Sequence, residues 1–227
     1  RPFVPALTDW PAPTPDVVAA NLAALRARIG DDVEIVAVTK GFGPDAVRAA
    51  AAAGLRLIGE NYAQELAAKA PVAREAGLAV HFIGQLQTNK VRQLAPIVDV
   101  YESVDRPRLV AELAKRAPGA TVLVQVDTTG EPGKGGCPVT DVPALVEAAR
   151  TAGLHVDGLM TVGPTTGGPE AARPGFRLVR RLVDELGLRT CSMGMSGDLE
   201  VAVAEGATRV RVGTALFGPR RPKGTPP

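Results

Sequence analysis

Lys40 is the residue of this chain whose position most suggests covalent chemistry. It ends the apolar, β-branched run Glu34-Ile-Val-Ala-Val-Thr-Lys40, and a Gly/Pro-rich break at Gly41 to Pro44 follows it. A near-continuous apolar strand is typical of a parallel sheet that is covered on both faces. A lysine that is partly desolvated beyond such a strand has its charged form disfavoured, so its amine can attack an aldehyde. A solvated lysine at the end of a strand is the plainer alternative.

A phosphate site is predicted at two later strand ends. Ser196 ends the run from Thr190, and Gly213 and Thr214 follow the run Arg209-Val-Arg-Val212. Barrels often bind phosphate after their last two strands, where a hydroxyl and a glycine that admits close backbone approach are suited to an anion. Helix capping is the alternative for Ser196. A lysine opposite a phosphate site indicates Schiff-base chemistry, either with a sugar phosphate, as in an aldolase, or with pyridoxal phosphate.

Eight strand–helix units, roughly 25 residues apart, are predicted to position these groups. The expected strands cover residues 34–40, 57–61, 80–84, 98–105, 121–127, 158–162, 190–196 and 209–213. This number and spacing predict an α/β protein that forms a single (β/α)8 barrel of the TIM type, with an extra N-terminal helix. An open doubly wound sheet is the alternative, because it uses the same alternation of strands and helices.

In a barrel, the carboxyl ends of the strands meet on one face, and barrel enzymes keep their sites there. The predicted residues at or near these ends are Lys40, Asn61, Gly84, Asp105, Met160, Ser196, Gly213 and Thr214. No linker or change in composition divides the chain. We therefore predict one domain over residues 1–227, with mobile ends at 1–14 and 219–227.

Composition excludes several classes of function. A net charge of +2 and an aromatic content of 4% disfavour a nucleic-acid-binding surface. Cys137 and Cys191 lack metal-ligand spacing and indicate a reducing compartment. The apolar runs are too short to span a membrane, and the first residues lack the apolar core of a signal peptide. We expect a cytoplasmic protein without a metal site or a membrane partner.

Six segments of the chain, taken in order, resemble one protein family. They are Ala37-Val-Thr-Lys40, Gly59-Glu-Asn-Tyr62, His81 to Lys90, Gly158-Leu-Met160, Ser192-Met-Gly-Met-Ser-Gly-Asp198 and Val210-Arg-Val-Gly-Thr-Ala-Leu-Phe-Gly218. Their combination, from about residue 15 to 220, is similar to the pyridoxal phosphate homeostasis proteins. That family in turn resembles the N-terminal barrel of bacterial alanine racemases.

The resemblance implies a set of cofactor contacts. Lys40 would hold pyridoxal 5'-phosphate as a Schiff base, Arg211 would face the pyridine nitrogen, and Asn61 would lie beside the ring. Ser196, Gly213 and Thr214 would bind the phosphate, and Met160 completes the cofactor-binding set. From the residues alone, Asn61 also fits a helix N-cap. Without the resemblance, Arg211 could equally be a strand arginine that faces outward and forms a salt bridge.

The resemblance also implies a function in intracellular pyridoxal phosphate homeostasis without efficient catalysis. Racemisation needs an acid and a base on opposite faces of the cofactor, and the position that resembles the racemase histidine under the ring is Val162. We expect no counterpart of the racemases' C-terminal domain, which supplies their tyrosine. We therefore expect a monomeric cofactor carrier, with apo-enzymes as recipients. A racemase of low activity is the first alternative, and a cofactor-free Schiff-base aldolase is the second.

Overall fold

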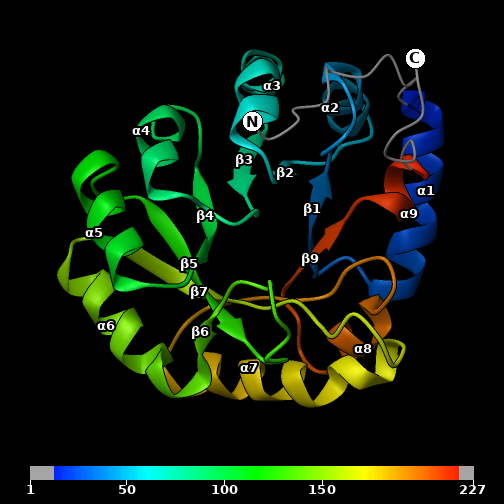
Figure 1. Cartoon of the computed structure of the whole chain (residues 1–227). Helices are drawn as coiled ribbons and strands as arrows, with labels where there is room; N and C mark the ends of the chain where they lie inside the picture. The colour runs from blue at the N-terminus through cyan, green and yellow to red at the C-terminus, as the bar shows by residue number, and fades with distance from the viewer. Residues whose placement is uncertain (1–12, 220–227) are drawn as a thin grey trace.

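Eight parallel strands close into a barrel in the computed structural model, which describes residues 13–219 (Figure 1). The strands of the ring are β1 (Glu34–Val38), β2 (Leu57–Glu60), β3 (Ala79–Phe82), β4 (Val100–Val104), β5 (Thr121–Asp127), β7 (His155–Met160), β8 (Thr190–Ser192) and β9 (Arg209–Val212). Each strand pairs with the next along the chain, and β9 returns to pair with β1. The two-residue β6 (Cys137–Pro138) adds to β5 beside the ring. The predicted barrel is confirmed, and the open doubly wound alternative is wrong because both edges of the sheet are paired.

Helices follow the strands and cover the outside of the ring. They are α1 (Pro15–Ile29), α2 (Pro44–Ala52), α3 (Ala63–Glu75), α4 (Val91–Leu94), α5 (Pro107–Arg116), α6 (Val142–Thr151), α7 (Arg173–Glu185), α8 (Leu199–Ala204) and α9 (Thr214–Phe217). Short 3-10 turns are η1 (Thr88–Lys90), η2 (Val139–Asp141) and η3 (Pro169–Ala172). Proline stands in the first turn of α1, α2 and α5, where no backbone N–H is needed. The predicted N-terminal helix is α1, which packs against α2 and α9.

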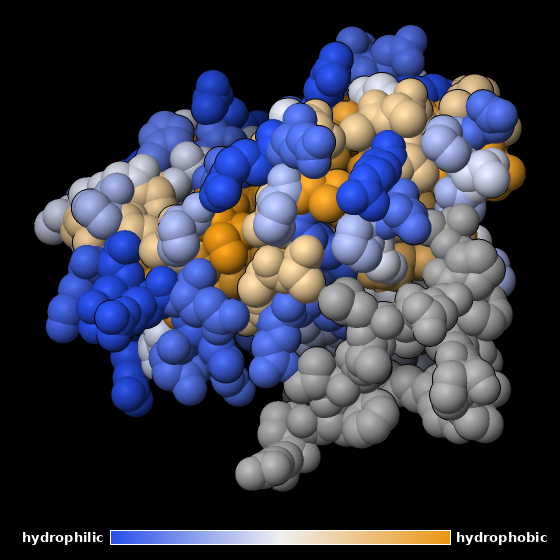
Figure 2. Space-filling view, turned by 90° about the horizontal axis from the view of Figure 1, so that it is seen from above, coloured by the Kyte–Doolittle hydropathy of each residue, from blue (hydrophilic) through white to orange (hydrophobic). Residues whose placement is uncertain are grey.

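The surface over these helices is mixed in character. Figure 2 shows one face on which hydrophilic side chains predominate and hydrophobic ones appear in small areas between them. Among the helices of residues 13–219, none is both long and apolar enough to cross a membrane.

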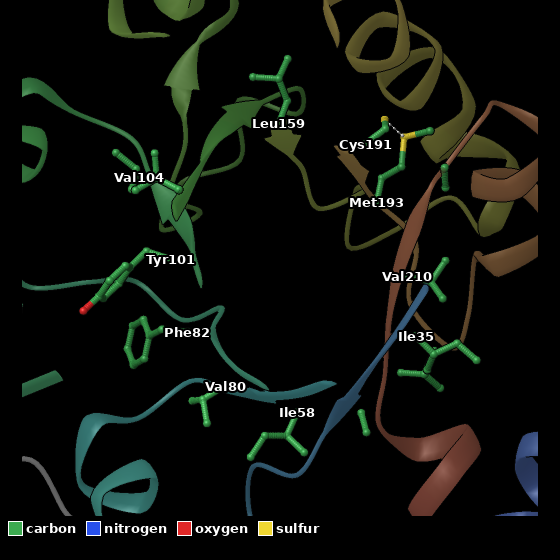
Figure 3. Close-up of a cluster of buried hydrophobic side chains, with 14 of the residues drawn as sticks. Ile35, Ile58, Val80, Phe82, Tyr101, Val104, Leu159, Cys191, Met193 and Val210 are labelled. Carbon is green, nitrogen blue, oxygen red and sulfur yellow. Dashed lines mark hydrogen bonds between the residues drawn. The ribbon is translucent and has the colours of Figure 1, made fainter. Parts of the chain in front are cut away.

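Strand alternation divides the buried side chains into two sets. Ile35, Ile58, Val80 and Val210 belong to the apolar layer between the strands and the helices, part of which is drawn in Figure 3. Because successive side chains in a strand point to opposite faces, the residues between them face the barrel interior. That interior is more polar than the outer layer: beside apolar side chains such as Val36 and Leu123, it holds the buried His81, Glu102, Ser192, Arg209 and Arg211.

Several predicted strands end earlier than expected, and two of these differences involve predicted site residues. The first ends at Val38, and Lys40 lies in a turn in which the Phe42 N–H donates to the Thr39 carbonyl at 3.1 Å. The seventh strand of the ring ends at Ser192, because Gly194 takes a φ of +97° that a strand cannot continue. Most of the predicted mobile ends, residues 1–12 and 220–227, lie outside the described residues.

Candidate functional site

The alternation of the strands directs two of the predicted residues toward the inside of the barrel, and three more lie just past strand ends. Ala37 on β1, Val212 on β9 and Leu159 on β7 belong to the outer apolar layer. Their neighbours within the strands therefore face inward, and these are Met160 and Arg211. Lys40, Asn61 and Gly213 follow β1, β2 and β9, outside the regular strands. Four of the five stand at or just past the carboxyl end of a strand, and Arg211 lies one residue before the end of β9.

Lys40 is half-buried in the turn after β1, and this turn packs against the last helix of the barrel. The Thr39 N–H donates to the Gly59 carbonyl at 3.2 Å, which ties the turn to β2. Phe42 is buried, and its ring centroid lies 5.6 Å from that of Phe217 on α9. The lysine turn and α9 are therefore in direct contact, although more than 170 residues separate them in the chain.

Ser196 lies beside the start of α9. Its Oγ accepts a hydrogen bond from the Ala215 N–H at 3.2 Å, which brings it next to Gly213 and Thr214. The turn at Gly194 makes this approach possible, since a Cβ there would lie 2.5 Å from the Ala202 Cβ. The capping alternative for Ser196 is wrong, because α8 begins at Leu199 with Asp198 as its N-cap residue. Gly213 is the N-cap residue of α9, and Thr214 is its exposed first residue.

Asn61 is half-buried after β2, and its Oδ1 is a buried acceptor with no hydrogen-bond partner among the described residues. The helix-cap alternative is wrong, because Tyr62 is the N-cap residue of α3 and no side chain caps that helix. Gly84 after β3 packs directly on Asn61: an added Cβ would lie 2.2 Å from the Asn61 carbonyl oxygen. A bound group with a donor at this place would satisfy the amide oxygen.

Arg211 is buried inside the barrel and points across it. One guanidinium nitrogen donates to the Ser192 carbonyl at 2.9 Å and to the Ser192 Oγ at 2.8 Å. The other donates to the Thr161 carbonyl at 2.7 Å, next to Met160. Burial lowers the pKa of this guanidinium from its usual value. The alternative of an outward-facing arginine in a salt bridge is wrong.

Arg211 belongs to a group of buried polar side chains inside the barrel, and the sequence analysis did not predict this group. The Ser192 hydroxyl donates to Glu102 Oε2 at 2.6 Å, and His81 Nδ1 lies 2.6 Å from Glu102 Oε1. Arg209 lies 3.6 Å from Glu102 Oε1. Burial alone would raise the pKa of Glu102, but its bond with His81 and the charges of Arg211 and Arg209 lower it to about 2. We call these five residues the Arg211 cluster.

A second buried group lies outside the wall of the barrel, between the ends of β1 and β2 and helix α3. Lys69 is fully buried, and its Nζ lies 2.7 Å from Glu60 Oε1 and 3.4 Å from Glu65 Oε2. The Thr39 hydroxyl also donates to Glu60. Burial raises the pKa of Glu60. We call these four residues the Lys69 cluster; the only sequence signal for it is the four-residue spacing of Glu65 and Lys69.

A separate cavity of about 330 Å³ holds none of the predicted residues. It lies between α3 and residues 95–99, and its wall includes Leu78, Val80 and Asp99. These residues stand at the beginnings of β3 and β4, the opposite end of the barrel from Lys40.

The family model "Alanine racemase, N-terminal domain" matches residues 14–221. The pyridoxal phosphate homeostasis protein of Pseudomonas aeruginosa is 42% identical over 220 residues, covering 89% of this chain and 96% of the relative. The one from Aquifex aeolicus is 40% identical, covering 88% and 92%. PipY of Synechococcus elongatus, solved with pyridoxal phosphate bound, superposes with a TM-score of 0.79 at 33% identity, covering 88% of this chain and 100% of PipY. The chain therefore belongs to the pyridoxal phosphate homeostasis protein family, which is built on the N-terminal barrel domain of alanine racemase.

Proposed function

We propose that this chain binds pyridoxal 5'-phosphate at the mouth of its barrel, as a Schiff base on Lys40, and holds it without efficient catalysis. The main support for this proposal is the half-buried position of Lys40 just past the end of β1. The chain is also 33% identical to a family member whose structure was solved with this cofactor bound. A lysine with restricted hydration is suited to such a bond, because its amine loses its proton more easily than in water.

The other side chains at the mouth fit the parts of the cofactor. Ser196, Gly213 and Thr214 gather at the start of α9, where a hydroxyl and backbone N–H groups suit a phosphate. The unsatisfied Oδ1 of Asn61 suits a hydrogen-bond donor beside the ring. Arg211 reaches the interior below the mouth, and the buried Met160 lies on β7 nearby.

These residues also account for weak catalysis. Pyridoxal phosphate supplies an aldehyde that condenses with amines and a ring that stabilises negative charge on a neighbouring carbon. Arg211 faces the ring nitrogen in this proposal, and a guanidinium only donates hydrogen bonds, so it supplies no proton to that nitrogen. Val162 cannot hold or move a proton at the position that resembles the racemase histidine. A racemase of low activity remains the second candidate, because the family model is that of a racemase domain.

A holding role has a chemical rationale in the reactivity of free aldehydes toward amines. We propose that the bound cofactor is released to apo-enzymes that need it, within the cell. The monomeric state stays a prediction.

The test is to incubate the purified protein with pyridoxal phosphate, reduce it with borohydride and locate the modified residue by peptide mass spectrometry. We expect a visible absorption band before reduction and a phosphopyridoxyl group on Lys40 after it. Lys40→Ala should lose both, whereas Lys90→Ala, which removes a half-buried lysine after β3, should keep both. A wild-type protein without the band or the adduct would refute the proposal.

The racemase alternative is separated by a second measurement on the same protein. Incubation with single enantiomers of common amino acids, followed by chiral chromatography, should show no sustained turnover. Sustained turnover that Lys40→Ala abolishes would replace the holding role with catalysis.

A further inference from the structure

We propose that the Lys69 cluster positions Lys40, by fixing the backbone on both sides of that residue from helix α3. This inference rests on the proposed bond between Lys40 and the cofactor. It concerns residues that touch the peptide groups of the lysine rather than the cofactor, so they are positioning residues.

The hydrogen bonds of the cluster reach both peptide groups that flank the Lys40 Cα. Lys69 Nζ donates to the Thr39 carbonyl at 2.8 Å, which belongs to the peptide group before Lys40. The Gly41 N–H donates to Glu65 Oε2 at 2.8 Å and belongs to the peptide group after it. Glu65 and Lys69 stand one turn apart on α3, so a single rigid element holds the two peptide groups.

Glu60 completes the cluster from the barrel side. Its Oε1 accepts from Lys69 at 2.7 Å and from the Thr39 hydroxyl. An ammonium group has three donors, and Lys69 uses them on the Thr39 carbonyl, Glu60 and Glu65. It is the one fully buried lysine in the stretch 13–219. A buried ion cluster contributes little net stability in general, so a role in local geometry explains its presence better than a role in global stability.

This fixing of the backbone by the Lys69 cluster would affect formation of the covalent bond at Lys40 more than binding of the phosphate group. With its backbone fixed, Lys40 moves its amine only through its own side-chain torsions, which favours attack on a bound aldehyde. The phosphate end lies at Ser196 and α9, and no hydrogen bond of the Lys69 cluster reaches these residues within the described part of the chain.

The experiment compares two ligands that share a phosphate and a ring. Pyridoxal phosphate can bond to Lys40, whereas pyridoxine 5'-phosphate carries an alcohol in place of the aldehyde and cannot. For Lys69→Met and Glu65→Leu we expect the affinity for pyridoxal phosphate and the rate of borohydride-trapped adduct formation to fall by about 10- to 100-fold. The affinity for pyridoxine phosphate should stay within about twofold.

Two further variants separate positioning from general destabilisation. Glu65→Gln keeps an acceptor for the Gly41 N–H and should recover most of the adduct rate lost in Glu65→Leu. Asp157→Asn removes a buried carboxylate of β7 that accepts from Arg189, just before β8, and from Thr190 on β8, away from the lysine turn. It should lower stability while leaving the ratio of the two affinities unchanged.

The outcomes are distinct. Equal losses for both ligands, or no loss for either, would overturn the positioning role while the wild-type adduct on Lys40 still stands. A wild type without that adduct would instead refute the proposed function. If the Lys69→Met and Glu65→Leu variants do not fold, amide hydrogen exchange of the wild type tests the proposal instead. The Gly41 N–H should be protected from exchange, and exchange at an unprotected rate would refute the positioning role of the Lys69 cluster.

Discussion

The two buried clusters of this barrel differ in place and in charge. The Lys69 cluster lies outside the strands and holds two carboxylates, Glu60 and Glu65, against one ammonium. The Arg211 cluster lies inside the strands and sets the single carboxylate of Glu102 among two guanidinium groups and His81. Burial raises the pKa of Glu60, whereas the surrounding positive charges hold that of Glu102 well below its usual value.

This difference teaches that burial alone does not decide the protonation of a carboxylate. Both groups are removed from water, which favours the neutral form. Glu102 is satisfied at both oxygens, while Glu60 Oε2 has no partner among the residues described. The balance of charge and of hydrogen bonds therefore sets the direction of the pKa shift, and the stability contributions of Glu102 and Glu60 should respond to pH in opposite ways.

The largest effect is expected from removing the carboxylate of the Arg211 cluster. Glu102→Leu would remove the buried negative charge beside Arg211 and leave His81 without its partner, although Arg209 would keep its ion pair with Glu34. We expect a loss of about 3–5 kcal/mol in the free energy of unfolding at pH 7, measured by urea denaturation. Tyr101→Phe is the control, because the neighbouring hydroxyl is buried without a partner in the described chain. It should change stability by less than about 1 kcal/mol; equal losses in the two variants would contradict this account.

A somewhat smaller effect is expected from acid. The pKa of Glu102 in the folded state is about 2, below the ordinary value of 4.5. Its contribution to stability is therefore complete above pH 4.5 and is lost as the pH falls from 4.5 toward 2, by about 3 kcal/mol in total. Glu102→Gln has no such group to titrate. Its unfolding free energy should fall less steeply over this range than that of the wild type, and parallel curves would show that Glu102 is not the group responsible.

The smallest effect, and one of opposite sign, is expected at Glu60. Its pKa is raised mainly by burial, and Lys69 and Thr39 offset part of that effect. Its contribution is thus present below pH 4.5 and is lost as the pH rises through its folded-state pKa. Glu60→Gln stays neutral, so its stability relative to the wild type should increase from pH 4 to pH 8 in urea denaturation. If the stability of Glu60→Gln relative to the wild type decreased from pH 4 to pH 8, the predicted difference between the two clusters would be wrong.

The fold was predictable because its signals are local. Each apolar run of strand length was followed by a helical segment, and eight such units lead to a closed barrel. The strand ends were less predictable. Lys40 and Ser196 lie beyond their strands, in turns set by a Thr39 to Phe42 hydrogen bond and by the conformation of Gly194.

The site was predictable only in part. The residues at the strand ends could be named in advance, because a barrel brings them to one face. Neither buried cluster was predicted, since Glu102, Lys69 and Glu60 look like ordinary charged residues in the sequence. Their partners are contributed by elements as far apart as β4 and β8, and nothing in the spacing of the chain indicates that pairing.

The sequence by itself determined the barrel, the lysine at the end of its first strand and the family to which the chain belongs. Alternation and strand–helix spacing are properties of neighbouring residues, so they can be read without coordinates. Only the tertiary structure decided that Arg211 points inward and donates to Ser192 and Thr161. It also decided that side chains of α3 form hydrogen bonds with the peptide groups on either side of Lys40. Those contacts depend on which side chains meet when the sheet closes, and closure brings together residues that are distant in the chain.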